Sequence, residues 1–298
     1  MESGGQALIS LAGGGYTATV AAHAGGRITS LEWRDTGPES APPRSLLVGW
    51  DGETFDEHAW PKAGMFPMVP FSNQLAPSGF MFKGRHVKPE TGPNGLALHG
   101  LGHRHPWNVI FSRADEVLLR YTHRAEGEPS WPWSFTCHQQ VNLSSSGLRV
   151  ALSIRNESTE VMPAGLGLHP YHPAPREWSR GALAFDAAHR HELAANGEAQ
   201  AAGGPPHFGM HAGETAAFSG WTGTYQLAVG GGLIEGSVAG TQRLVVHRPA
   251  EGSYLCVEPV TLLPGALAQA EMDPQACLSP GESRSLTWTC TFTPGDGP

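Results

Sequence analysis

Short apolar segments with alternating polar residues recur along almost the whole chain, and this repeat constrains the fold more than any other feature. An alternation of period two places apolar side chains on one face of an extended strand, whereas an amphipathic helix needs a period near 3.6. Most segments end at glycine, proline, asparagine, aspartate or serine, as strands do at turns. We predict strands at residues 16–20, 27–33, 109–111, 117–121, 133–137, 148–154, 225–229, 243–247, 254–257 and 285–292. The pattern predicts an all-β fold, most economically a large antiparallel β-sandwich.

Helix-period patterns are almost absent, apart from possible short helical turns at residues 61–65 and 262–270. The 39 glycines and 25 prolines are spread between the apolar runs, which favours many turns over a disordered chain. Residues 35–44 and 187–213 have little apolar periodicity and are predicted to be excursions from the sheets. Because no linker separates two compact halves, we expect residues 1–298 to form one domain.

Charge and composition limit the partners. A net charge of −8 leaves no basic surface for a phosphate backbone, so nucleic acid is not an expected partner. The first residues lack the cationic start of a secretory signal, and no stretch approaches the ~20 apolar residues that span a bilayer. We therefore expect a cytoplasmic protein, monomer or homodimer, without a membrane partner. The four cysteines are scattered, which indicates reduced thiols.

His169 is the first candidate for chemistry. It stands in Gly167-Leu-His169-Pro170-Tyr171, after a predicted strand, where a sheet is expected to give way to a loop. Pro170 restricts the residue before it to extended backbone, and a titratable ring on stiff backbone suits proton transfer. Taken alone, the same residues also fit a partly buried structural histidine.

Glu258 is the second candidate. It directly follows the apolar run 254–257, and Pro259 is expected to end the strand there. A carboxylate beside apolar residues at the mouth of a sandwich has its pKa raised by desolvation and can act as a base near neutral pH. The alternative is a solvated glutamate at the end of a strand.

His99, in Leu98-His99-Gly100, has two further histidines nearby, His103 and His105. Their spacing raises the possibility of a metal site, but no carboxylate stands at the position that would complete the ligand set. His99 alone also fits a surface loop. We expect no metal, because histidine spacing without a full ligand set is weak evidence. Because no serine elbow or phosphate-binding glycine loop is present, the chemistry left is acid-base catalysis without a cofactor.

Several blocks occur in an order and spacing that resemble the aldose 1-epimerase, or galactose mutarotase-like, family, from about Ile28 to the C-terminal strand. The blocks are Pro70-Phe-Ser-Asn73-Gln74-Leu, Gly79-Phe80-x-Phe82-x-Gly84, Leu98-His99-Gly100, Trp131-Pro-Trp133-x-Phe135, Gly167-x-His169-Pro170-Tyr171, Phe218-x-Gly220-Trp221 and Val257-Glu258-Pro259. The resemblance implies a large β-sandwich with a sugar cleft.

The resemblance also implies roles for individual residues. His169 would be the acid that protonates the ring oxygen of a pyranose, and Glu258 the base that takes the proton of the anomeric hydroxyl. His99, Asn73, Gln74 and Tyr171 would contact the sugar. The ring would open and reclose as the other anomer, and a nearby negative charge would help to keep His169 protonated.

The chain departs from the family pattern at three places. Gln74 stands where the family usually has arginine, and Thr215 and its neighbours stand where an aspartate is common. After Glu258, Pro264-Gly265-Ala266-Leu267-Ala268 replaces the usual Pro-Asp-Ala-x-Asn. These departures leave the identity of the sugar open, and they leave a second hypothesis, a non-catalytic carbohydrate-binding or regulatory protein on the same fold. Because the arginines are scattered and phosphate needs several of them, we expect a neutral aldose as substrate.

Overall fold

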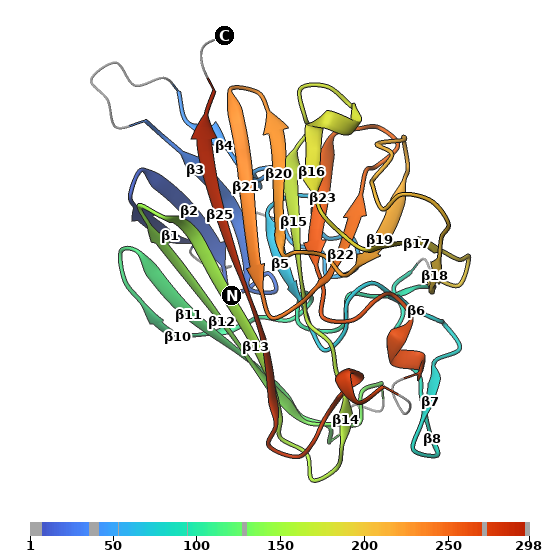
Figure 1. The fold of residues 1–298 in the computed structure, drawn as a ribbon. Helices are drawn as coiled ribbons and strands as arrows, with labels where there is room; N and C mark the ends of the chain where they lie inside the picture. The colour runs from blue at the N-terminus through green and yellow to red at the C-terminus, as the bar shows by residue number, and fades with distance from the viewer. Residues whose placement is uncertain are drawn as a thin grey trace.

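The computed structural model describes residues 8–35, 42–52, 54–93, 95–126, 130–269 and 273–295. Two large sheets form a sandwich, and all pairings between their named strands are antiparallel (Figure 1). This confirms the predicted fold class. No helix among the described residues is long and apolar enough to cross a membrane.

The first sheet has eleven strands. In spatial order they are β1 (Ile9–Gly13), β2 (Tyr16–Ala21), β3 (Arg27–Trp33), β5 (Met65–Met68), β15 (Gly167–Pro173), β23 (Tyr254–Pro259), β22 (Arg243–His247), β19 (Thr215–Ser219), β17 (His189–Leu193) and β18 (Ala199–Ala201), with β4 (Arg44–Ser45) beside β3. The second sheet has eight strands: β10 (Asn108–Ser112), β11 (Glu116–His123), β12 (Phe135–Ser144), β13 (Gly147–Asn156), β25 (Ser283–Pro294), β21 (Gly232–Ala239), β20 (Thr224–Val229) and β16 (Leu183–Phe185).

Smaller elements complete the described part of the chain. They are the strand pairs β6 (Gln74–Leu75) with β9 (Ala97–Leu98), β7 (Phe80–Phe82) with β8 (Arg85–Val87) and β14 (Met162–Pro163) with β24 (Cys277–Leu278), and the 3-10 helices η1 (Arg180–Ala182), η2 (Ala266–Gln269) and η3 (Pro274–Ala276). The β7–β8 hairpin projects from one end of the sandwich (Figure 1).

The alternation seen in the sequence produces the core. Along β12, buried and partly exposed residues alternate from Phe135 onward, so that one face of the strand packs inside. Large aromatic side chains such as Trp131, Trp133 and Trp288 are almost fully buried in the hydrophobic core. No disulfide joins the four cysteines, and three of them are buried.

The structure corrects several expectations about individual segments. Residues 187–213 are not simply an excursion, because they contain β17 and β18 at one edge of the larger sheet. Residues 61–65 form no helix, and Met65 begins β5. The predicted turn at 262–270 contains η2. Of the expected excursion 35–44, residues 36–41 lie outside the described residues, and Arg44 begins β4.

Candidate active site

A cavity of about 290 Å³ lies where the middle of the eleven-stranded sheet meets the β6–β9 ribbon. This volume is close to the lower limit for small-molecule pockets, and it suits one sugar ring better than a chain of sugars. The lining residues include Asn73, Gln74, His99, His169, Tyr171 and Glu258. The cavity therefore brings together the predicted site residues. A larger groove of about 740 Å³ lies on the other sheet and is lined by residues such as Thr289 and Gln226. Its described lining includes no buried acid and base that face each other.

His169 lies inside β15, in the middle of the sheet, and not at the sheet-to-loop boundary that was expected. The expectation was wrong because β15 is buried on both faces and contains Pro170, so it shows no alternation. The imidazole packs against both Phe66 and Tyr171, with ring centroids 4.7 Å and 4.6 Å away, and these two rings also contact each other with centroids 6.2 Å apart. The two contacts restrict the orientation of the imidazole.

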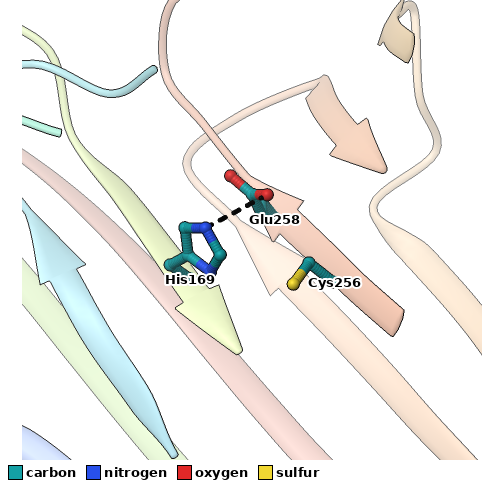
Figure 2. Close-up of side chains that lie close together, drawn as sticks. All are labelled: His169, Cys256 and Glu258. Atoms are coloured by element: carbon teal, nitrogen blue, oxygen red, sulfur yellow. Dashed lines mark ion pairs between the residues drawn. The ribbon is translucent and has the colours of Figure 1, made fainter. Parts of the chain in front are cut away.

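Glu258 also lies inside its strand. It is one residue beyond the predicted strand 254–257 and is paired with Val245 of the adjacent β22, while β23 ends at Pro259. The alternative of a solvated glutamate is excluded, since the residue is 2% exposed. Its Oε1 lies 3.5 Å from Nε2 of His169, and the two side chains face each other from neighbouring strands (Figure 2). The other carboxyl oxygen, Oε2, has no hydrogen-bond partner among the described residues.

Burial controls the protonation of this pair. Desolvation raises the pKa of Glu258 to about 8. The pKa of His169 lies well below its usual value, first because of burial and then because His99, His247, Lys62 and Arg27 repel a charged ring. The expectation that a nearby negative charge keeps His169 protonated is wrong, because Glu258 itself favours its neutral form here. The free protein therefore favours a neutral acid beside a neutral imidazole.

His99 and Asn73 form a second unit, at the end of the β6–β9 ribbon. Both are buried and both have left-handed backbone, with φ of 59°. The His99 backbone N–H donates to the Asn73 carbonyl at 3.0 Å, and the Asn73 backbone N–H donates to Nδ1 of His99 at 3.2 Å. Burial, assisted by the charges of Lys62 and Arg104, lowers the pKa of His99 to about 3. The ring is therefore neutral with its proton on Nε2, which makes it a hydrogen-bond donor.

The glycine after His99 is expected to be essential for this backbone. Gly100 has φ of +73°, and a Cβ added there would lie 2.1 Å from the Val69 carbonyl oxygen. We expect Gly100→Ala to destabilise the protein by well over about 1 kcal/mol, measured by urea unfolding, because it adds a backbone clash to the strain of a left-handed alanine. Gly84→Ala is the matched control, since Gly84 has φ of +74° and open space around it. Equal losses in the two variants would contradict this account.

Tyr171 and Gln74 occupy different parts of the cavity. The Tyr171 ring is mostly covered, with 2% of the residue exposed; besides stacking on His169 it accepts a hydrogen bond from Nε1 of Trp60 at 3.4 Å. Gln74 is partly exposed and packs beside Gly197, in the turn between β17 and β18. One wall of the cavity therefore comes from the segment that showed no periodicity in the sequence.

Sequence reasoning missed part of the lining: Trp60, Lys62, Leu193, Val245, His247 and Tyr254. Thr215 was noted only as a departure from the family pattern. In the structure its hydroxyl is 2.7 Å from Nδ1 of His247, across the β19–β22 pairing. Only the register of these strands brings the two together, and no local motif signals it.

Within the described part of the chain, one group of side chains could hold a metal. Ligand atoms of His169, Cys256 and Glu258 lie within 4.8 Å of one another, with Cys256 on the same strand as Glu258 (Figure 2). The positive charges of Lys62 and Arg27 act on His169 and oppose a cation there. His103 and His105, considered as ligands in the sequence, contact different aromatic rings: His103 lies against Trp60 and His105 stacks on Tyr121.

Comparisons relate the chain to known proteins. The family model described as aldose 1-epimerase matches residues 7–201. The uncharacterized protein YphB of Escherichia coli (strain K12) is 32% identical over 143 residues, which cover 47% of this chain and 44% of YphB. The match thus spans less than half the length of this curated relative.

Solved structures show the same fold over almost the whole chain. A galactose mutarotase-like protein from Clostridium acetobutylicum superposes with a TM-score of 0.77 at 19% identity, covering 96% of this chain and 95% of that chain. A GalM/aldose epimerase homologue from C. elegans superposes with a TM-score of 0.76 at 17% identity, covering 97% of this chain and 99% of that chain.

Proposed function

Because the chain belongs to the aldose 1-epimerase family, we propose that it interconverts the α and β anomers of a neutral aldose. The observation that carries the proposal is the pair formed by His169 and Glu258, 3.5 Å apart and almost fully buried at a cavity of sugar size. Anomerisation needs one proton donated to the ring oxygen and another removed from the anomeric hydroxyl. These two oxygens are bonded to the same carbon, so their partners must be close together.

In the proposed mechanism His169 is the acid and Glu258 is the base. Opening of the ring moves the proton of His169 to the ring oxygen and the hydroxyl proton to Glu258. Rotation about the bond next to the free carbonyl and reversal of both transfers give the other anomer. The reaction starts from the ion pair, which carries as many protons as the neutral pair that the free protein favours, so a proton must first pass from Glu258 to His169 across the 3.5 Å between Oε1 and Nε2. Ring opening then returns the pair to two neutral groups.

The surrounding residues are proposed to hold the sugar. His99 offers its Nε2–H to a sugar oxygen, and the Asn73 amide nitrogen is buried without a partner among the described residues. Gln74 adds an uncharged amide at the rim. Tyr171 acts chiefly on His169, by fixing its ring. The described lining of the cavity contains no arginine, and Lys62 is its one lysine, so it lacks the cluster of arginines that grips phosphate, which favours a neutral sugar.

The direct test is the rate at which freshly dissolved aldoses reach anomeric equilibrium, followed by polarimetry or saturation-transfer NMR. We expect the native protein to accelerate at least one neutral aldose from a panel of hexoses and pentoses. Saturable sugar binding with no acceleration for any member would refute the enzyme and support the carbohydrate-binding alternative.

The pair predicts a defined pH dependence. The active form carries one proton fewer than the fully protonated pair. It is lost on the acid side when His169 gains a proton, well below pH 6.5, and on the alkaline side when the last proton leaves near pH 8. We expect kcat/KM, corrected for buffer catalysis, to be level between these limits and to fall above about pH 8. A rate that kept rising from pH 8 to 10 would contradict this assignment.

A further inference from the structure

We propose that Lys62 is a specificity-determining residue of this site, whose ammonium group binds sugar hydroxyls. The inference rests on the proposed function, because it takes the cavity to be a sugar site. Lys62 lies in the segment between β4 and β5, and its side chain lines the cavity together with Gln74 and His99. No sequence motif pointed to it.

The position of the ammonium group is fixed by an aromatic ring. Nζ of Lys62 lies 4.1 Å from the centroid of Trp60, close enough for a cation–π contact. Trp60 in turn donates its indole N–H to the hydroxyl of Tyr171. The charged group is therefore tied to the residues that surround the acid-base pair.

The ammonium group has no acidic ion-pair partner in the part of the chain that the structure describes. Among the ion pairs of the described residues none involves Lys62. The side chain is exposed at the cavity, yet partial desolvation and the charge of Arg27 lower its pKa. An ammonium group that faces the cavity, with three donors and no ion-pair partner among the described residues, can donate to oxygen acceptors of a ligand. Since the other polar side chains at the rim are uncharged, Lys62 supplies the charge-assisted hydrogen bonds.

Lys62 also acts on the titrating rings. The charged and titratable side chains around His169 are Glu258, His99, His247, Arg27, Tyr171, Cys256 and Lys62. The charge of Lys62 lowers the pKa of His99, His169 and His247, so it lies near all three rings. Removing this charge is expected to raise the pKa of His169, which a purely structural role would not do.

The experiment compares native protein with Lys62→Met and Lys62→Arg. Lys83→Met is the matched control, since Lys83 also lies over an aromatic ring, Phe82, but outside this cavity. Calorimetric binding is measured for D-glucose, D-galactose and D-mannose, and for the 2-, 3-, 4- and 6-deoxy analogues of the tightest binder. The acid limb of the pH–rate profile is measured for each variant.

We expect Lys62→Met to bind the parent sugar about 10-fold to 100-fold more weakly, and to lose discrimination against one deoxy analogue. Its acid limb should move to higher pH, while Lys62→Arg should keep both properties in part and Lys83→Met should match native protein. Unchanged affinity of Lys62→Met for the parent sugar would overturn the proposal. The same holds if Lys62→Met discriminates against every deoxy analogue as strongly as native protein does, or if native protein binds none of the three hexoses.

The two proposals fail in different ways. Acceleration by native protein with unchanged binding in Lys62→Met rejects the role of Lys62 and leaves the epimerase intact. Lys62-dependent binding without acceleration rejects the epimerase and leaves the sugar site.

Discussion

Replacing Glu258 by glutamine is expected to lower kcat for anomerisation by about 10²–10⁴-fold, the usual contribution of a positioned general base. The amide keeps the shape of the carboxyl group but cannot accept the hydroxyl proton. His169→Asn should lose a similar factor. Because the two groups act in one concerted proton exchange, the double variant should lose little more than either single variant.

Polarimetry on the best aldose of the panel measures these rates. Glu251→Gln is a suitable control, because Glu251 is exposed and does not line the cavity. A Glu258→Gln variant that kept more than about a tenth of the native kcat would show that another group is the base.

The same substitution should stabilise the folded protein at alkaline pH. The pKa of Glu258 is about 8 when folded and near 4.5 when unfolded, so the folded state binds more protons between these values. The free energy of unfolding of native protein therefore falls as pH rises from about 4.5 to 8, and this contribution levels off above. The glutamine side chain has no proton to lose, so the variant should gain on the order of 4 kcal/mol over native protein at about pH 8.5 and almost nothing at about pH 4.5.

Urea unfolding of native protein, Glu258→Gln and Glu251→Gln at both pH values tests this expectation. Only Glu258→Gln should show a difference that grows with pH. A difference of the same size at both pH values would mean that the carboxyl group is not desolvated in the fold.

The strands that show alternation could be predicted closely from the sequence. Predicted residues 27–33 and 243–247 coincide with β3 and β22. The strands β5 and β15 could not be predicted, because their residues are buried on both faces and show no period of two. Those strands form the centre of the sheet, and β15 holds His169.

The candidate site could likewise be predicted only in part from the sequence. His169, Glu258 and His99 could be singled out from local sequence and resemblance, but the proximity of His169 and Glu258 depends on the order β15–β23–β22 in the sheet. The protonation of His169 could not be predicted, because it depends first on burial within the sheet and then on His99, His247, Lys62 and Arg27, which are distant in sequence.

The acid-base pair and most of the groups proposed to hold the sugar belong to separate structural units. His169 and Glu258 project from adjacent strands of the large sheet, whereas Asn73, Gln74 and His99 belong to the β6–β9 ribbon and its flanks. Substitutions in the ribbon can therefore change which sugar is accepted while the reacting pair keeps its place. Evolution, or a mutant library restricted to the ribbon, could diversify sugar preference on an unchanged reaction centre.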